Sequence, residues 1–419
     1  MARRAAIAAA TAVLAAACTD DGATAPTALP ATTTSTTVLE RVNDGVLRIG
    51  LLLPESGAGA TIGQPLIDAA LAAVEVIDAA GGVLGHPIDV VTADEGDSPS
   101  TAREGIAHLI ERDVDAVVGP ASSTIALATL DDLLDAGVLA CSPTATALAL
   151  DDFPDRELFI RTAPSDSLQA LAIADEAERT GALAAELLYL DDAYGRPLAE
   201  ATMDALAATG ISVVEPIGFL ADDESLLDEA NEVIASNAGV IVVIGDAEQG
   251  ARMLSGLGEV SGVVSGQDQP RIIVNDAMRR APSPQQIAEL AADIRNRIIG
   301  LAPSAYSQST DAPPGPYAAN AVDCVNLIAL ASEQAQSDNP EEIAAQIASV
   351  SDGGSTCRLF AECVQLLSAV PNIDYEGTGG QVQIGSDGDP VRYRFDRWGF
   401  DEQGADVLLT NAAIPVNRS

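Results

Sequence analysis

Hydroxyl and carboxylate side chains recur in this sequence where an apolar run ends and a helix-like pattern begins. In the first half these points carry hydroxyl groups, in PASSTIA after Gly119 and SPTATALAL after Cys141. In the second half they carry carboxylates, in DDAYG after Leu190, DAEQG after Gly245 and DAMRR after Asn275. Hydroxyl groups and free helix N–H groups suit an anion, and carboxylates suit an ammonium group. The two sets together predict a binding site for a zwitterion.

Three of these side chains have the clearest expected roles. Ser123 and Thr146 stand near predicted helix starts, where they can add hydroxyl donors to unpaired backbone N–H groups and hold a carboxylate without Lys or Arg. Asp276 can pair with an ammonium group. The competing interpretation of any single Ser or Thr is an ordinary helix N-cap, and that of any single Asp is a solvated loop residue.

Catalytic patterns are weak by comparison. Gly57, Gly59 and Gly63 form G-x-G-x-x-x-G after a predicted strand, but a dinucleotide loop has a different spacing and a later acidic residue that this sequence lacks. His86 and His108 are the two histidines, and both are predicted far from the strand ends. There is no C-x-x-C motif. We therefore expect no cofactor and no metal, and a nucleotide-cofactor enzyme such as a dehydrogenase is the less favoured alternative.

Composition bounds the size and the partners of the protein. The 419 residues, 47% of them hydrophobic, favour two domains with aliphatic cores. The chain has 62 acidic and 21 basic residues, a formal net charge of −41, and every basic residue is Arg. So negative a surface repels phosphate backbones, which excludes nucleic acid as a partner.

The N-terminus has the pattern of an export signal. MARRAAIAAATAVLAAACTD has two arginines near its start, Arg3 and Arg4, followed by an apolar run too short to span a bilayer stably. VLAAAC resembles a bacterial lipobox, which predicts a signal peptide over residues 1–18 and lipidation of Cys18. Ala15 stands where the lipobox usually has Leu, and Leu14 is one place early. The alternative is an ordinary secretory signal with an incidental cysteine.

Residues 19–45 are rich in Thr, Ala and Pro and predict a flexible linker. With a lipid on Cys18, this linker would tether the protein to the outer face of the cytoplasmic membrane.

Four cysteines follow Cys18. Outside the cytoplasm an even number favours disulfides. Cys357 and Cys363 flank a short loop and are the first expected pair. Cys141 and Cys324 pair by elimination, with two buried free thiols as the alternative.

From residue 46 onward, short apolar runs alternate with amphipathic segments. This pattern predicts an α/β fold in which helices cover both faces of parallel sheets. Strands are expected over residues 46–54, 86–94, 114–120, 138–143, 186–192, 211–219, 238–246 and 271–276. Helices are expected over residues 65–82, 100–113, 122–137, 195–210, 225–236, 248–258, 317–336 and 340–351. Residues 379–410 predict antiparallel strands, with SDGDP as a plain turn.

Six motifs in order carry a family resemblance: IGLLLPESGAGATIGQP, VIDAAGGVLGHPIDVVTADEGDSP, VVGPASSTIALA, SPTATAL, FIRTAPSDSLQ and LDDAYGRPLA. Residues 46–416 resemble the bacterial leucine/isoleucine/valine-binding proteins, the type I periplasmic substrate-binding proteins of ABC importers. The resemblance is densest up to Gly245. It implies two Rossmann-like lobes joined by three crossover hinges, with a small solute bound between them.

The resemblance also implies the extent of each lobe. Lobe 1 would comprise residues 46–164 and 302–376, and lobe 2 residues 165–301 and 377–416. The stretch FIRTAPSD, with Arg161 and Asp166, resembles the first hinge.

The resemblance assigns roles to four residues. Ser123 matches the serine that binds the ligand carboxylate, and Thr144 matches a position whose backbone carbonyl meets the ammonium group. Thr146 matches a threonine that touches both ends of the ligand head group. Tyr194 matches a tyrosine that lines the cleft from the second lobe.

Three further positions depart from the family pattern. Asp276 falls where the family usually has Glu, a longer arm for the same ammonium group. Asp246 stands where an aromatic residue is common, and Ile62 where a tryptophan can cover the side-chain pocket. These departures leave the ligand side chain open. An added acid at position 246 favours a cationic or more polar ligand, or simply holds water.

The resemblance implies a monomeric extracytoplasmic substrate-binding protein that closes on an amino acid or similar solute and presents it to an ABC-type permease. The alternative within binding proteins is a receptor for an amide, for urea or for a sensory ligand on the same fold.

Overall fold

The computed structural model describes the chain from Asn43 onward with short gaps. The described ranges are 43–57, 59–154, 156–236, 238–261, 269–280, 284–304, 315, 317–377, 380–409 and 414–417. The predicted signal peptide, Cys18 and the predicted linker as far as residue 42 lie outside these residues.

The last residues of the predicted linker belong to the folded region. The Asn43 side-chain amide donates to Ser337 Oγ at 2.7 Å. The backbone N–H groups of Asp44 and Gly45 donate to Asp338 Oδ2 at 2.9 and 2.7 Å. The fold therefore starts slightly before the predicted boundary.

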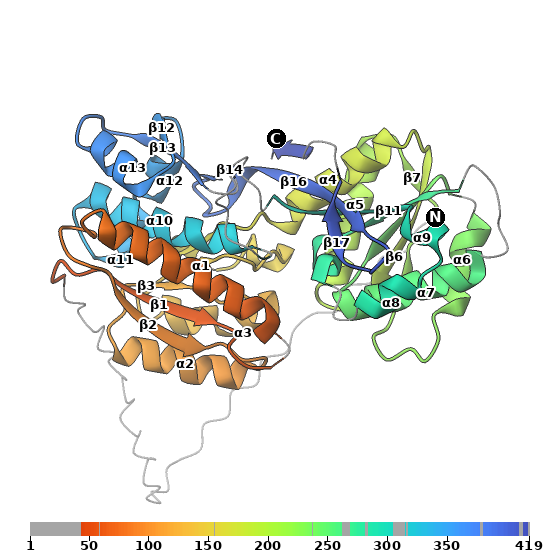
Figure 1. The fold of residues 1–419 in the computed structure, drawn as a ribbon, viewed down its shortest axis with the longest axis horizontal. Coiled ribbons are helices and arrows are strands. Elements are labelled where there is room, and N and C mark those ends of the chain that lie inside the picture. Colours follow the sequence, from red (N-terminus) through yellow and green to blue (C-terminus); the bar gives the residue numbers. More distant parts are fainter. Residues whose placement is uncertain are drawn as a thin grey trace, which may run out of the picture. The chain divides into compact units, whose positions relative to one another are not determined.

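The first sheet is parallel, in the order β2-β1-β3-β4-β5. Its strands are β1 (Arg48–Leu53), β2 (Asp89–Asp94), β3 (Ala116–Val118), β4 (Leu139–Ser142) and β5 (Phe159–Arg161). One face carries α1 (Ala60–Ala79) and α10 (Ala318–Ala335), which pack together, and the other carries α2 (Pro99–Glu111) and α3 (Ser123–Leu134), as Figure 1 shows. Leu51 and Leu52 belong to different cores because successive strand side chains point to opposite faces.

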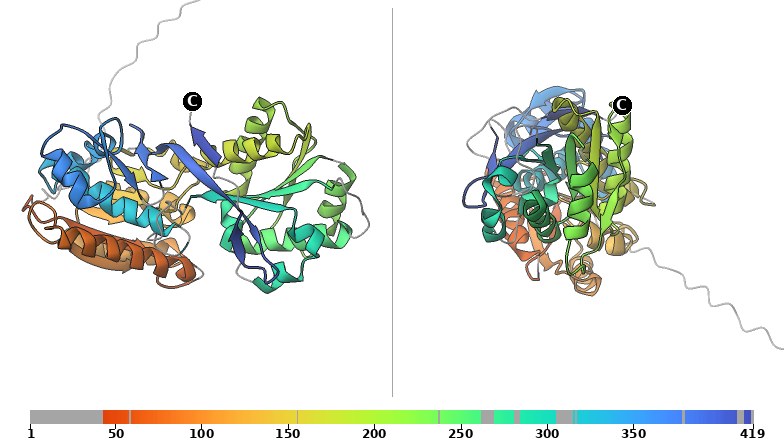
Figure 2. Two further views of the ribbon diagram at one scale, coloured as in Figure 1. Left: turned by 45° about the horizontal axis from the view of Figure 1, so that its top comes forward. Right: turned by 90° about the vertical axis from the view of Figure 1, so that its right-hand side faces the viewer.

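The second sheet is mixed, in the order β15-β16-β11-β10-β9-β6-β7. Its main strands are β6 (Ala184–Leu190), β9 (Val240–Ile244), β10 (Arg271–Val274), β11 (Ile298–Pro303) and β16 (Pro390–Phe400). The first four are parallel, and β16, the long blue strand in the left view of Figure 2, pairs with β11 in the antiparallel sense. Gly300 permits this pairing, since a Cβ there would lie 1.9 Å from the ring of Trp398.

Helices cover both faces of the second sheet. One face carries α4 (Asp166–Arg179) and α5 (Gly195–Ala208), whose apolar residues share a core with β6 and β9. The other carries α6 (Leu227–Ser236), α7 (Ala247–Ser261), α8 (Pro284–Glu289) and α9 (Ala292–Arg295). Short β7 (Ser212–Val213) and β8 (Ile217–Phe219) border β6.

The remaining elements are short. They are η1 (Leu148–Leu150), η2 (Arg156–Leu158), η3 (Asp276–Arg280), α11 (Pro340–Ala344), α12 (Ile347–Ser351), β12 (Ser355–Cys357), α13 (Phe360–Leu367), β13 (Ile373–Gly377), β14 (Gly380–Gln381), β15 (Gln383–Ile384), β17 (Asp406–Leu408) and β18 (Ile414–Asn417). Strands β12, β13 and β14 form a small third sheet, and β17 and β18 pair with β16.

Two predicted elements differ in detail. The strand expected over 211–219 is divided into β7 and β8, with Pro216, which has no N–H group for a ladder, between them. The helix expected over 340–351 is two short helices, α11 and α12. Val382 and Ile384 pack in the core of the first sheet, although they fall in a segment that the resemblance assigns to lobe 2.

Both expected disulfides are present. Cys141 in β4 bonds to Cys324 in α10, and Cys357 bonds to Cys363. The first bond is fully buried and ties the sheet to the helix that covers it. The alternative of two free thiols is therefore wrong.

Within the described part of the chain, α1 is the helix with the length and apolar composition of a membrane span. Leu66, Ala70, Val74 and Ile77 of this helix pack into the core of the first sheet. The apolar composition of α1 is therefore explained by its packing beside α10.

Candidate functional site

Ser123 joins two strand ends of the first sheet. It is the first residue of α3, and the preceding Ser122 caps the helix by accepting from the N–H of Ile125. The Ser123 Oγ instead accepts from the N–H groups of Thr146 at 3.1 Å and Ala147 at 3.2 Å. Ser122 supplies the helix cap, and both of these hydrogen bonds use the Ser123 Oγ as the acceptor. The hydroxyl hydrogen of Ser123 can therefore be donated.

The two predicted threonines lie in the same loop, after β4. Thr144 Oγ1 donates to the carbonyl oxygen of Ala121 at 2.5 Å, which ties this loop to the start of α3. Thr146 is buried, and its carbonyl oxygen accepts from the N–H of Asp166 at 2.8 Å. The structure thus brings Ser123, Thr144 and Thr146 together.

The start of α3 already holds a carboxylate of the protein. Glu95 is fully buried and accepts from the N–H groups of Ala121 and Ser122, each at 2.7 Å. Burial raises the pKa of Glu95 to about 7, although these two hydrogen bonds act in the opposite direction. The expectation that free backbone N–H groups at this helix start hold an anion is therefore wrong for these two groups, which Glu95 occupies.

Asp276 is held by two tyrosines. It starts η3, is separated from β10 by Asn275, and is buried. The Tyr194 hydroxyl donates to Asp276 Oδ1 at 3.4 Å and accepts from the side-chain amide of Asn275 at 3.1 Å. The Tyr317 hydroxyl donates to Asp276 Oδ2. Tyr317 lies directly before α10, so this contact joins segments that the resemblance assigns to different lobes.

A second buried carboxyl group stands beside Asp276. Asp166, the first residue of α4, is 1% exposed, and its Oδ1 has no hydrogen-bond partner among the described residues. Burial and then the negative charge of Asp276 raise the pKa of Asp166 well above its usual value. Burial, followed by the charges of Asp166 and Asp276, likewise raises the pKa of Tyr194. A cation between these groups would relieve their repulsion.

The other predicted ligand-binding residues have different contacts. Asp246 is exposed, and its Oδ1 accepts from the N–H of Gln249 at 2.7 Å at the start of α7. Ile62 is half-buried and packs against the core of the first sheet. The described contacts connect neither residue to Asp276.

The turn before Tyr194 has a structural explanation. Asp192 Oδ1 accepts from the N–H groups of Tyr194 and Gly195 at 2.9 and 2.7 Å, and Asp191 pairs with Arg196. These two acids therefore shape the turn that positions Tyr194.

A buried ion pair supports the loop after β4. Arg161, at the end of β5, donates from Nε and Nη2 to the two carboxylate oxygens of Asp389, each at 2.6 Å. Its Nη1 donates to the carbonyl oxygens of Ala145 at 3.4 Å and Ala147 at 3.2 Å, on either side of Thr146. Asp389 lies in the predicted SDGDP turn. No local pattern marks it as buried, because its partner is 228 residues away.

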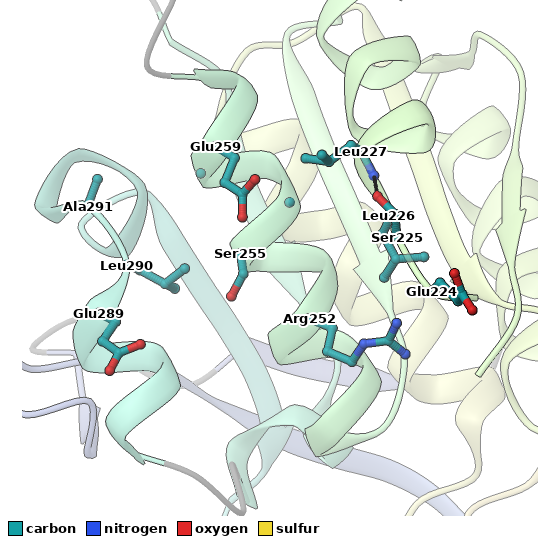
Figure 3. Close-up of a pocket in the computed structure, with 12 residues that line it drawn as sticks. Glu224, Ser225, Leu226, Leu227, Arg252, Ser255, Glu259, Glu289, Leu290 and Ala291 are labelled. Atoms are coloured by element: carbon teal, nitrogen blue, oxygen red, sulfur yellow. Dashed lines mark hydrogen bonds between the residues drawn. The ribbon is translucent and has the colours of Figure 1, made fainter. Parts of the chain in front are cut away.

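A cavity in the second half of the chain lies away from these residues. It has a volume of about 650 Å³ and lies among the start of α6, α7 and the α8–α9 connection (Figure 3). Glu224, Arg252, Glu259 and Glu289 are among its lining residues, and it includes no predicted ligand-binding residue. Among the described residues, no group of three His, Cys, Asp or Glu side chains is arranged to hold a metal ion.

The sequence matches the model of a known family over residues 46–354, described as periplasmic binding protein. The chain belongs to the periplasmic binding protein family. This membership confirms the resemblance to binding proteins and the predicted α/β fold.

Two curated relatives of this periplasmic binding protein illustrate the family. It is 29% identical to the chemotactic signal transduction system substrate-binding protein BasB of Halobacterium salinarum, over 82% of this chain and 84% of that protein. It is 28% identical to the Leu/Ile/Val-binding protein BraC3 of Rhizobium johnstonii, over 52% of this chain and 61% of that protein. The second match therefore spans less than two thirds of the relative.

Solved structures share the fold of this periplasmic binding protein. LivJ of Streptococcus pneumoniae, in complex with isoleucine, has a TM-score of 0.66 at 22% identity, covering 88% of this chain and 99% of that chain. A solute-binding protein of R. palustris in complex with benzoate has a TM-score of 0.62 at 18% identity, covering 90% and 98%. These similarities confirm the type I periplasmic-binding-protein fold.

Proposed function

We propose that this chain is the substrate-binding protein of an ABC importer and takes an amino acid or similar small polar solute. Ser123, Thr144 and Thr146 form the side that receives an anionic or polar group, and Tyr194 and Asp276 form the side that receives an ammonium group. The observation that carries the proposal is the buried carboxylate of Asp276. Among the described residues its hydrogen-bond donors are two tyrosine hydroxyls, and it lies beside the carboxyl group of Asp166.

The hydrogen bonds of the cluster define how a ligand would enter it. The Ser123 Oγ is fixed by two N–H groups, so its own hydrogen is directed away from them and can be donated to a ligand oxygen. An ammonium group would replace the Tyr317 hydroxyl as the donor to Asp276. An ammonium donor adds its own positive charge to the hydrogen bond with the carboxylate, which a neutral tyrosine hydroxyl does not.

Binding would couple to a change in the population of conformers. The contact between Tyr317 and Asp276 joins segments that precede α10 and follow β10, which lie on different sheets. A ligand that contacts both sheets stabilises the conformer in which they approach each other, and a permease can recognise that conformer. A micromolar dissociation constant, about −8 kcal/mol, suits capture followed by release.

The relatives support a small organic ligand and leave its side chain open. One relative is named for Leu, Ile and Val, and one structural neighbour holds benzoate. The test is a thermal-shift screen of the purified protein with the twenty amino acids, small amides, urea, polyamines and benzoate, followed by calorimetry on each hit. Saturable binding of an amino acid supports the proposal. Stabilisation by nicotinamide cofactors alone would refute it.

We also propose export and anchoring through a lipid on Cys18, with the protein acting as a monomer beside its permease. Radiolabelled palmitate incorporated by wild-type protein and not by Cys18→Ser would support the anchor. Equal labelling of the two proteins would contradict it.

A sensory receptor is the second candidate, because the relative BasB is named for a chemotactic signal transduction system. Uptake and chemotaxis assays on a deletion strain distinguish the two functions. Loss of solute uptake supports the importer, whereas loss of chemotaxis with normal uptake supports the sensory function.

A further inference from the structure

A second pocket, on the side of the second sheet that carries α4, is lined by an unusual concentration of arginines. It has a volume of about 460 Å³, and its charged lining residues are Arg179, Arg271, Arg397 and Glu176. Over the whole sequence acidic residues outnumber basic ones by 62 to 21, so three arginines around one glutamate reverse the general balance.

The inner wall of the pocket contains an incompletely satisfied ion pair. Arg397 in β16 donates from Nη2 to Glu176 Oε1 at 2.6 Å, with side-chain exposures of 15% and 2%. The Arg397 Nε and the Glu176 Oε2 are both buried, and neither has a hydrogen-bond partner among the described residues. A buried donor without an acceptor is destabilising, and an oxyanion in the pocket would supply the acceptor.

The outer wall of the pocket carries Arg271 and Arg179. Arg271, at the start of β10, is exposed and donates to the carbonyl oxygen of Asn296 at 3.2 Å. It forms no ion pair with a carboxylate in the described ranges. Burial lowers the pKa of the neighbouring Arg297 guanidinium; the charge of Asp293 acts in the opposite direction, and the positive charge of Arg271 adds a smaller lowering. Arg179 is paired with Asp175 at 2.9 Å, so it contributes less net charge.

At this pocket the nearby arginines determine the electrostatic potential more than the net charge of the whole protein does. The Debye length is about 8 Å at physiological ionic strength, so acids elsewhere on the surface are largely screened. Guanidinium groups present paired donors that match the oxygens of a phosphate group. We propose that this pocket binds a phosphate group, supplied by free inorganic phosphate or by the headgroup of an anionic phospholipid. The proposal is independent of the amino-acid site.

The test compares Arg271→Gln with Arg103→Gln in the purified full-length protein. Arg103 is an exposed arginine of the first half, paired with Asp132 at 3.0 Å, so both variants lose one positive charge. Calorimetry with inorganic phosphate at constant ionic strength should show saturable binding to the wild type. The dissociation constant should rise at least fivefold in Arg271→Gln and stay within twofold in Arg103→Gln.

The source of the phosphate is resolved by co-sedimentation with phosphatidylglycerol vesicles. A fivefold weaker association of Arg271→Gln than of Arg103→Gln assigns the pocket to a lipid headgroup. A phosphate effect without a vesicle effect assigns it to a soluble phosphate. If neither probe binds saturably to the wild type, or if both variants behave alike with both probes, the proposal is wrong.

Discussion

Arg161 and Asp389, 228 positions apart in the chain, form a fully buried bidentate ion pair in which both N–O distances are 2.6 Å. Arg161 is the last residue of β5 in the first sheet, and Asp389 directly precedes β16 of the second. The same guanidinium reaches the carbonyl oxygens that flank Thr146. The Arg161 side chain therefore holds together two segments that cross between the sheets. It also supports the loop of the proposed ligand site.

Asp389→Asn should destabilise the protein by about 3 kcal/mol, because it leaves the buried charge of Arg161 only partly compensated. Denaturant unfolding followed by circular dichroism measures this change. Ligand affinity, measured by calorimetry on the folded variant, should also fall as the loop loses its support. Asp132→Asn breaks an exposed pair with Arg103 and should change stability by less than about 1 kcal/mol. Equal effects of the two substitutions would show that the buried pair has no special role.

Asp276→Asn and Thr146→Ala should each weaken ligand binding at least tenfold while leaving the fold intact. Asn removes the charge that would pair with an ammonium group, and Ala removes a hydroxyl from the polar side of the site. Calorimetry with the best ligand from the screen measures the change. Thr202→Ala is the matched control, since Thr202 is buried in α5 and its hydroxyl donates to the carbonyl oxygen of Leu198 in the same helix. Unchanged affinity in both site variants would remove the cluster as the ligand site.

Asp246→Asn separates the predicted ligand role of Asp246 from the capping role that the structure gives it. The Asp246 carboxylate accepts from the N–H of Gln249, and an Asn side chain can replace it as an N-cap. We expect less than a twofold change in ligand affinity by calorimetry. A tenfold loss would instead support the role that the family resemblance implied.

The sequence predicts local structure well because strands and helices leave periodic patterns. Such patterns predict the strand ends that carry Ser123 and Thr146, and parallel pairing of β3 and β4 brings these ends together. Asp246 satisfies the same strand-end rule, yet it caps a helix. Position at a strand end does not determine which way a side chain points.

No local sequence pattern predicts the contacts between residues that are far apart in the chain. Tyr317 and Asp276 are 41 residues apart, and the segment around Tyr317 has only the pattern of a helix start. Glu95 follows β2 as an ordinary acidic residue, but packing places it under the start of α3. Which polar residue becomes buried depends on how the helices and strands pack. The periodicity of a single sequence does not predict that packing.

The two disulfides should differ in their contribution to stability. Cys141–Cys324 closes a segment of 183 residues and Cys357–Cys363 one of 6 residues. Loop-closure entropy predicts a loss of about 5 kcal/mol for a paired Cys→Ala replacement of the first and about 2 kcal/mol for the second. Denaturant unfolding of the two double variants measures the difference. A larger loss from the short loop would show that local strain or packing outweighs chain entropy.

Glu95 should make the protein less stable as pH rises. Its pKa in the folded state is about 7, against an ordinary value of 4.5, so the folded protein retains a proton that the unfolded chain releases. The protonated carboxyl group stabilises the fold below pH 4.5, and this contribution is lost between pH 4.5 and 7, by about 3 kcal/mol in total. Denaturant unfolding at several pH values should therefore show a shallower decline for Glu95→Gln than for wild type. Glu259→Gln, an exposed change in α7, should keep the wild-type slope. Parallel curves for wild type and Glu95→Gln would mean that Glu95 is already ionised in the fold, with the two N–H groups outweighing its burial.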